Sequence, residues 1–358
     1  IRPPRAATMP SSISHGPAAA IGASRARVQT RSHCMGRTLS VLAPSVSMVW
    51  NAMVSLWFTQ ALLPTGWATG VRARIEGNSI ASVETGVAPA PGDDRHGPAF
   101  PGLANVHSHA FQRGMAGLAE AAGPADDDFW TWRETMYRFV LTLDPDRIEA
   151  IAALAFAEMA EAGFTTVGEF HYLHHAPDGA PYANRAELAE RIAAAAASAG
   201  IGLTLLPVFY AHGNFGGAAP GPRQARFLNT PDGYAALLDC CRAAIAPLKD
   251  ARLGVAPHSL RAATLDEVRA VAELAGGGHI HVHAAEQTRE VEDCVAHFGA
   301  RPVDVLLDRI GLDARWCLVH ATHLTESETK RLAQSGATAG LCPVTESNLG
   351  DGVFPAPA

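Results

Sequence analysis

Lysine is almost absent from this chain of 358 residues, and its scarcity limits the kind of catalytic site that the chain can build. The two lysines are Lys249 and Lys330, and both fall in stretches with a helical pattern. Some metal sites hold two ions that are bridged by a modified lysine at the end of a strand. Neither lysine stands at such a position, so we expect any metal site here to hold a single ion.

One cysteine motif and one glycine motif are also missing. The six cysteines form no C-x-x-C pair, and Cys240 and Cys241 are adjacent within a helical pattern. In a chain of this size, such spacing favours reduced, packed thiols over a disulfide framework, and it predicts a cytoplasmic protein. No G-x-G-x-x-G motif follows the first predicted strand of the α/β part, which argues against a dinucleotide-binding sheet.

Acidic residues are absent from residues 1–74, where Arg, Ser, Ala and Pro are frequent. This composition is typical of a transit peptide or of translated sequence upstream of a true start. We therefore predict that residues 1–52 are a disordered or non-native extension and that the protein proper starts at Met53. The apolar run over residues 41–58 is interrupted too often to predict a membrane span.

Overall charge and hydrophobicity set further limits. The formal net charge is −7, which argues against a nucleic-acid partner. Hydrophobic residues make up 48% of the chain, enough for a large buried core. The length allows one domain of the barrel type or two ordinary domains.

Two different patterns follow Met53. Residues 53–100 alternate apolar and polar side chains around Gly-rich turns, which predicts a small β-rich segment. Residues 101–358 alternate short apolar runs with longer stretches rich in Ala, Glu and Arg. For example, residues 163–172 predict a strand, and residues 183–200 predict a helix that ends at Gly200. This alternation indicates parallel β/α units, arranged as a barrel or as an open sheet.

Polar residues at the predicted strand ends favour the barrel. In a (β/α)8 barrel the carboxyl ends of all strands meet at one rim, where the active site lies, whereas an open sheet would spread them along a line. We therefore predict an α/β fold of the (β/α)8 TIM-barrel type. The strand ends number about seven, so we expect an incomplete barrel and a partial gene product. These ends carry His107 and His109, Glu169 and Tyr172, Tyr210 and His212, His258, His283 and Glu286, His320 and His323, and Glu346 and Asn348.

The segment PGLANVHSHAFQRG, residues 101–114, contains the first histidine pair. His107 and His109 are two residues apart at the end of a strand, so their side chains point to the same side. They can therefore place two nitrogens on one metal ion. An H-x-H pair alone is about as often a coincidence of two unrelated surface histidines.

A second cluster strengthens the metal interpretation. The segment HIHVHAAEQ places His279, His281 and His283 in alternation, followed by Glu286. His283, at the strand end, supplies a third imidazole, and we expect at least one of the other two histidines only to pack. Glu286 can reach a water on the metal without being a ligand. Three neutral imidazoles with an open position suit one catalytic zinc ion, which lowers the pKa of its water towards neutrality.

Six segments together resemble the amidohydrolase superfamily and, within it, the formimidoylglutamate deiminase family of bacterial histidine degradation. The resemblance runs from about Met53 to Ala358. The H-x-H and H-x-x-E spacings specify only the deaminase branch, whereas HAFQRGMAGLAE and FWTWRETMYR are more specific. The six segments are PGLANVHSHAFQRGMAGLAE, DDDFWTWRETMYR, APHSLRA, HVHAAEQ, LVHATHL and LCPVTESNLGDGVFP.

The resemblance implies a role for each candidate residue. It makes His107, His109 and His283 the ligands of one zinc ion. Glu286 becomes the general acid/base that moves a proton from water to the imine nitrogen, and His320 orients the water and stabilises the transition state. The implied substrate is N-formimino-L-glutamate, a dicarboxylate that two arginines on separate loops would bind through forked donors. The residues that fall around the substrate are Gln112, Arg133, Tyr172, His258 and Arg261.

The chain departs from this family at its end. The family completes its zinc site with an aspartate on the eighth strand, and the predicted strands here stop at the seventh. Asp351 lies in the Gly-rich loop just beyond and does not substitute easily. This departure keeps an inactive metal-binding fragment open as an alternative, and a ring-base aminohydrolase of the guanine or cytosine deaminase type is the rival enzyme. Dimers are common in this fold family, so a homodimer is one expected assembly; we expect no membrane partner.

Overall fold

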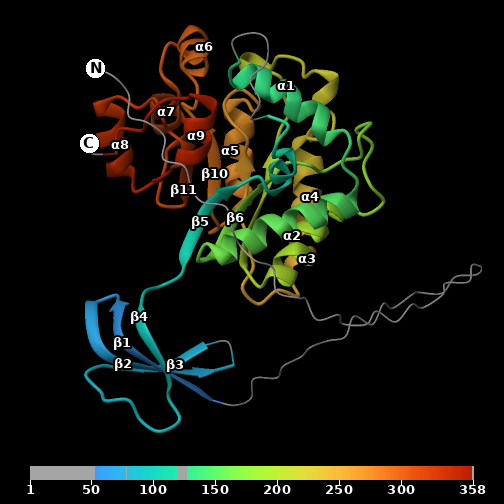
Figure 1. The fold of residues 1–358 in the computed structure, drawn as a ribbon. Helices are drawn as coiled ribbons and strands as arrows, with labels where there is room; N and C mark the ends of the chain where they lie inside the picture. Colours follow the sequence, from blue (N-terminus) through green and yellow to red (C-terminus); the bar gives the residue numbers. More distant parts are fainter. Residues whose placement is uncertain (1–52, 78, 120–126, 357–358) are drawn as a thin grey trace, which may run out of the picture.

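The computed structural model describes residues 53–77, 79–119 and 127–356. The prediction for residues 1–52 lies outside the described residues. Along the described chain, a four-stranded sheet is followed by a larger α/β domain (Figure 1). None of the helices in these ranges is both long enough and apolar enough to cross a membrane.

The small sheet is held by hairpin pairing and by one buried ion pair. Its strands follow the order β3-β2-β1-β4, with β1 and β4 parallel. Arg72 on β2 is buried and donates from Nε and Nη2 to the Asp93 carboxylate at 3.1 and 2.9 Å. This hydrogen bonding lowers the pKa of Asp93 far below its ordinary value, so the pair stays charged. The strands are β1 (Val54–Leu63), β2 (Gly66–Glu76), β3 (Ser79–Glu84) and β4 (Asp94–Ala99).

The α/β domain contains parallel strands in sequential order. One sheet runs β5-β6-β7-β8, and β9 continues beside β7. Two isolated parallel bridges, Val255 to Ile280 and Ser259 to His283, connect the β8/β9 region to the sheet β10-β11-β12. The strands are β5 (Leu103–Ser108), β6 (Phe164–His171), β7 (Gly202–Phe209), β8 (Arg252–Leu253), β9 (Ala256–Pro257), β10 (Ile280–Ala284), β11 (Trp316–His320) and β12 (Thr338–Gly340).

These strands form the incomplete barrel that the sequence predicts. Within the described ranges, β5 pairs only with β6 and β12 pairs only with β11, so the first and last strands are both edges. Leu103 and Val106 on β5 are accordingly 48% and 39% exposed. Counting β8 and β9 as one position, the strands occupy seven positions: β5, β6, β7, β8/β9, β10, β11 and β12.

Amphipathic helices cover the strands (Figure 1). In α2, the buried residues Ile148, Ala152, Ala155 and Phe156 recur at helical spacing and form one apolar stripe. Gly200 ends α3 in the left-handed conformation, with φ +71°, at the predicted position. The helices are α1 (Phe129–Val140), α2 (Pro145–Glu161), α3 (Glu187–Ala199), α4 (Pro231–Ile245), α5 (Leu265–Leu274), α6 (Thr288–Phe298), α7 (Pro302–Val305), α8 (Glu326–Ser335) and α9 (Pro343–Leu349). Shorter turns are η1 (Ala110–Met115), η2 (Phe215–Gly217), η3 (Pro222–Gln224) and η4 (Leu306–Ile310).

The last predicted strand is shorter than its pattern indicates. Strand β12 ends at Gly340, and α9 begins at Pro343, a residue that favours the first turn of a helix. Glu346 and Asn348 therefore lie on α9. The sequence pattern predicted that they stand at a strand end, and that prediction is wrong.

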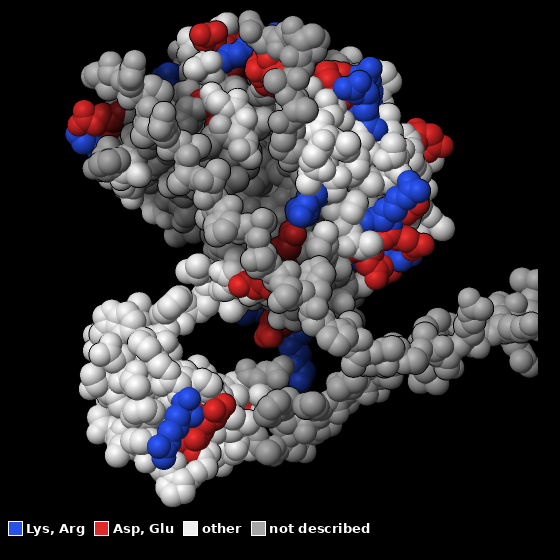
Figure 2. Space-filling view, viewed as in Figure 1, with Lys and Arg blue, Asp and Glu red and all other residues white. Residues whose placement is uncertain are grey.

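Charged side chains of both signs are mixed on the face that Figure 2 shows. Ion pairs also link neighbouring elements. Arg191 on α3, for example, donates to Glu149 on α2 at 2.9 Å and to Glu187 on its own helix at 3.0 Å. Exposed pairs of this kind contribute little each, so the buried core carries most of the stability.

Candidate active site

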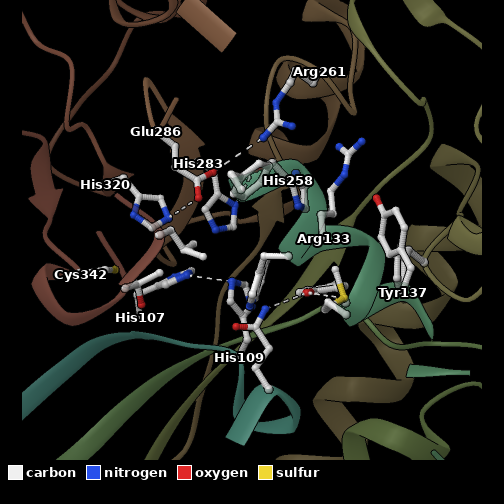
Figure 3. A pocket seen from close by; sticks show the side chains of 18 of the residues that line it. His107, His109, Arg133, Tyr137, His258, Arg261, His283, Glu286, His320 and Cys342 are labelled. Carbon is white, nitrogen blue, oxygen red and sulfur yellow. Dashed lines mark hydrogen bonds and ion pairs between the residues drawn. The ribbon is translucent and has the colours of Figure 1, made fainter. Parts of the chain in front are cut away.

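One pocket lies among the loops at the carboxyl ends of the strands (Figure 3). The structure brings all of the sequence-predicted site residues to its wall. These residues are His107, His109, Gln112, Arg133, Tyr172, His258, Arg261, His283, Glu286 and His320.

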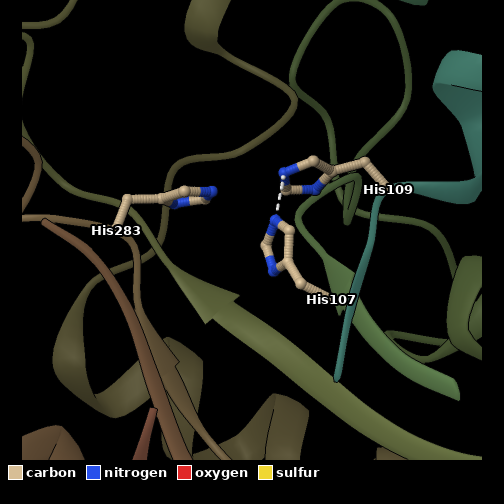
Figure 4. Close-up of side chains that lie close together, drawn as sticks. All are labelled: His107, His109 and His283. Carbon is tan, nitrogen blue, oxygen red and sulfur yellow. Dashed lines mark hydrogen bonds between the residues drawn. The ribbon is translucent and has the colours of Figure 1, made fainter. Parts of the chain in front are cut away.

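Three imidazoles converge at one side of this pocket. His107 lies on β5, His109 directly follows that strand, and His283 lies on β10. One ring nitrogen from each lies within 4.8 Å of the others, and the Nε2 atoms of His107 and His109 are 3.0 Å apart (Figure 4). Two strands that are distant in sequence thus supply a set of three nitrogens.

The backbone fixes the protonation of two of these rings. Nδ1 of His109 lies 3.0 Å from the carbonyl oxygen of Phe170, and Nδ1 of His283 lies 3.1 Å from that of His258. A carbonyl only accepts, so each Nδ1 carries the proton and each Nε2 offers a lone pair. Burial lowers the pKa of His109 to about 4 and the pKa values of His107 and His283 well below the ordinary value. Three neutral, preoriented imidazoles fit a divalent ion such as zinc.

A buried carboxyl group anchors the turn that carries His109. Oε1 of Glu169, at the end of β6, accepts a hydrogen bond from the backbone N–H of Ala110 at 2.8 Å. Burial raises the pKa of Glu169 to about 8, because the site has little water to solvate a charge. Glu169 thereby ties β6 to the first residue of η1 and holds His109 against its neighbours.

Glu286 follows β10 and faces two cationic groups. Its Oε1 lies 3.5 Å from Nε2 of His320, and its Oε2 lies 3.8 Å from Nη2 of Arg261. Burial raises the pKa of Glu286. For His320, burial alone would lower the pKa, but Glu286, Cys342 and Glu346 together hold it well above the ordinary value. The pocket therefore places a carboxyl group of raised proton affinity beside an imidazolium.

His320 also belongs to a second group of possible metal ligands. One ligand atom each from His320, Cys342 and Glu346 lies within 4.8 Å of the others. Here, however, Oε1 of Glu346 already accepts a hydrogen bond from the Cys342 backbone at 3.0 Å and lies 3.4 Å from Nδ1 of His320. These atoms are engaged with one another, so the three-histidine group is the better candidate for a catalytic metal.

The backbone is strained at the strand ends that carry these groups. Ala285, His320 and Ala321 have φ values of +51°, +67° and +49°, in the left-handed region that non-glycine residues avoid. Such a conformation costs roughly 1–2 kcal/mol per residue. The N–H of Ala321 donates to the carbonyl of Ala284 at 3.0 Å, which holds the end of β11 against β10.

Two guanidinium groups form another part of the pocket wall. Arg133 lies on α1 and not on a loop, which corrects the expectation from sequence, while Arg261 lies in the loop after β9. Arg133 stacks over Trp130, with Cζ 4.5 Å from the ring centroid. The Nε atoms of both arginines are buried without a hydrogen-bond partner among the described residues. Each arginine therefore retains donor capacity for a ligand.

Tyr172, Gln112 and His258 line the same wall. The Tyr172 hydroxyl accepts a hydrogen bond from Nε2 of Gln112 at 3.2 Å. Nδ1 of His258 lies 3.0 Å from Oγ of Ser259, and its carbonyl is the group that holds His283. His258 thus supports the histidine group through its backbone as well as lining the pocket.

Some pocket residues were not assigned to the site from sequence. Phe129 and Trp132 contribute an apolar part of the pocket wall. Tyr137 follows Arg133 by one turn of α1, a spacing that would have signalled it, and Tyr210 was singled out only as a strand-end residue. Leu349 comes from α9, which no strand pattern could place. The further lining residues are Met136, Tyr137, Tyr210, Phe227, Cys342, Thr345 and Leu349.

Other histidines lie elsewhere. Nε2 of His212 pairs with Glu267 at 2.9 Å, outside this pocket. His279 and His281 line a separate cavity at the amino ends of the strands. Asp351 is buried in the turn after α9 and accepts a hydrogen bond from Gln287. Burial raises the pKa of Asp351 to about 6.

Two family models match the chain. The model of the amidohydrolase family matches residues 99–358, and that of the N-terminal domain of formimidoylglutamate deiminase HutF matches residues 54–97. Formimidoylglutamate deiminase from Pseudomonas aeruginosa is 50% identical over 311 residues, covering 85% of this chain and 67% of that protein. The chain thus spans about two thirds of that relative's length.

Solved structures agree with this match. An amidohydrolase from Brucella melitensis superimposes with a TM-score of 0.83 and 57% identity, covering 85% of this chain and 68% of its own. An adenosine deaminase from Xanthomonas campestris with bound zinc superimposes with a TM-score of 0.64. It covers 85% of this chain and 65% of its own at 20% identity, a likeness of fold alone.

Proposed function

This chain belongs to the formimidoylglutamate deiminase family of amidohydrolases, and on that basis we propose that its pocket hydrolyses N-formimino-L-glutamate to N-formyl-L-glutamate and ammonia. One observation carries the proposal: the three-histidine group and the guanidinium groups of Arg133 and Arg261 line the same pocket. A substrate with one reactive imine carbon and two carboxylates matches that combination.

We propose one zinc ion for this site, held by His107, His109 and His283. The fixed tautomers and the depressed pKa values of these rings support the assignment. When bound, zinc would supply Lewis acidity and lower the pKa of a water molecule towards neutrality.

Glu286 and His320 would handle the protons. Glu286 is buried and its pKa is raised, so it can take a proton from water and pass it to the departing nitrogen. Ammonia then leaves and the formyl group stays on the glutamate. His320, held protonated beside Glu286, would stabilise negative charge that develops at the reacting carbon's oxygen.

The arginines favour the dicarboxylate over a ring base. Guanine and cytosine carry no carboxylate, and they would leave two guanidinium groups in this pocket without an anionic partner. Gln112, Tyr172 and His258 are proposed to complete the contacts with the substrate. A cytoplasmic location is part of the same proposal, supported by the free thiols of Cys240, Cys241, Cys294, Cys317 and Cys342.

The test is release of ammonia from N-formimino-L-glutamate by the full chain supplied with zinc. We expect turnover by the wild type and none by Glu286→Gln, which should still bind the metal. Zinc retention by the wild type without ammonia release would overturn the proposal and favour an inactive metal-binding fragment. Ammonia release only from guanine or cytosine would instead favour a ring-base aminohydrolase.

A further inference from the structure

A glutamine and two tyrosines form a buried cluster next to Arg133. Gln224 belongs to η3, Tyr137 to α1, and Tyr210 follows β7; each is only 6% exposed. Nε2 of Gln224 donates to the Tyr210 hydroxyl at 2.6 Å and to the Tyr137 hydroxyl at 3.3 Å. Both tyrosines line the pocket, whereas Gln224 does not.

The orientation of the Gln224 amide is determined by its other end. Oε1 accepts a hydrogen bond from the backbone N–H of Gly221 at 2.7 Å. A backbone N–H only donates, so the oxygen must face Gly221 and the amino group must face the tyrosines. Both phenol oxygens therefore act as acceptors towards Gln224, and their own protons must point elsewhere.

Burial raises the pKa of Tyr210, so its hydroxyl keeps its proton. Because the amino group of Gln224 donates to the Tyr137 oxygen, the proton of Tyr137 points away from Gln224. Arg133 lies beside it in the pocket, with Cζ 5.5 Å from the Tyr137 ring centroid, and a guanidinium offers only donors.

Tyr137, Arg133 and Arg261 line the pocket and offer it more hydrogen-bond donors than acceptors. Buried donors are normally satisfied, so their missing acceptor is expected to come from a ligand with several acceptor atoms. Arg261 lies 3.8 Å from Glu286, at the reacting end of the pocket. Arg133 and Tyr137 lie beyond it, on the side away from Glu286 (Figure 3).

We propose that Tyr137 is a specificity-determining residue of this site: its hydroxyl donates to the side-chain carboxylate of the substrate, and Gln224 is the positioning residue that orients that hydroxyl. The inference rests on the proposed function, because the substrate must place a second carboxylate beyond the reacting carbon. The α-carboxylate, which is closer to the imine, would then face Arg261.

The experiment is calorimetric binding of two ligands to the full chain. N-formyl-L-glutamate carries the side-chain carboxylate, and N-formyl-L-norvaline has the same carbon skeleton without it. Tyr137→Phe should weaken binding of the glutamate ligand about tenfold or more, the usual effect of losing a hydrogen bond to a charged group. Binding of the norvaline ligand should change less than about twofold. Tyr234→Phe is the matched control, because the Tyr234 hydroxyl is also buried but donates to the carbonyl of Pro207 outside the pocket.

Gln224→Leu tests the positioning role. It should weaken binding of the glutamate ligand selectively, and the double variant with Tyr137→Phe should bind no more weakly than Tyr137→Phe alone. Such non-additivity shows that Gln224 acts through Tyr137, whereas a merely structural effect would weaken both ligands and would add.

The outcomes separate the two proposals. If the wild type prefers the glutamate ligand and Tyr137→Phe keeps that preference, the role of Tyr137 is wrong while the dicarboxylate function stands. If the wild type does not distinguish the two ligands, the dicarboxylate function fails and the inference fails with it.

Discussion

Nδ1 of His320 lies 3.4 Å from Oε1 of Glu346, while Nε2 of the same ring faces Glu286 at 3.5 Å. The two carboxylates lie at opposite nitrogens of one buried imidazole. Glu346 also accepts a hydrogen bond from the backbone of Cys342, so the first turn of α9 fixes its position. The imidazole is thereby oriented by a group that does not face the substrate.

Glu346→Gln should lower kcat about tenfold or more, the usual effect of losing a supporting carboxylate, with zinc content and KM little changed. The neutral amide removes a charge that raises the pKa of His320, so the limb of the kcat–pH profile that reports His320 should move to lower pH. Glu326→Gln, on the exposed side of α8, is the control. An unchanged kcat and pH profile would show that Glu346 does not act through His320.

Replacing the arginines separately should reveal which part of the substrate each one binds. Arg133→Gln should raise KM about tenfold with a small change in kcat, because one charged hydrogen-bonding contact is lost. Arg261→Gln should lower kcat as well, since Arg261 also lies beside Glu286. Steady-state kinetics with N-formimino-L-glutamate measures both. Unchanged KM values in both variants would contradict the dicarboxylate assignment.

His283→Ala should abolish stoichiometric zinc binding, as measured by metal analysis after dialysis. The wild type should also show a melting temperature that rises with added zinc, because a ligand that binds only the folded state stabilises it. That rise should disappear in the variant. His281→Ala is a matched control from the same strand, outside the three-histidine group. Loss of zinc from His281→Ala as well would show that the whole strand is perturbed.

His171 should make the fold sensitive to acid. Burial, followed by the charge of Arg226, lowers its pKa to about 3, against an ordinary value of 6.5. Between these two pH values the unfolded chain binds a proton that the folded chain does not, so stability falls as the pH falls. The slope for one proton is at most about 1.4 kcal/mol per pH unit. Relative to wild type, His171→Phe should lose this slope in urea unfolding measured from pH 7 to pH 4, and the partly exposed His96→Asn should keep it. Equal slopes in wild type and His171→Phe would refute the assignment.

The sequence could bring the histidines of the pocket together because they stand at or beside strand ends, and strand ends follow from local alternation. His107, His283 and His320 could be placed together without knowing any distance, since parallel strands share one rim. Gln224 and Tyr137 are 87 residues apart, and no local sequence pattern indicates that they are in contact. Glu346 was expected at a strand end, but the chain turns into α9 at Pro343. Contacts made by helices and loops depend on tertiary packing. The hydrophobic periodicity of the sequence, two residues in strands and 3.6 in helices, does not specify that packing.

The left-handed backbone at Ala285 and Ala321 couples the heat resistance of this fold to its rate of turnover. Glycine would adopt the same conformation with less strain, so each alanine is a position at which greater stability is available. Glycine would also let the chain beside Glu286 and beside His320 sample more directions. A thermostable relative obtained by substitution at these two positions should therefore hold its imidazole less firmly, and the gain in heat resistance would come with slower turnover.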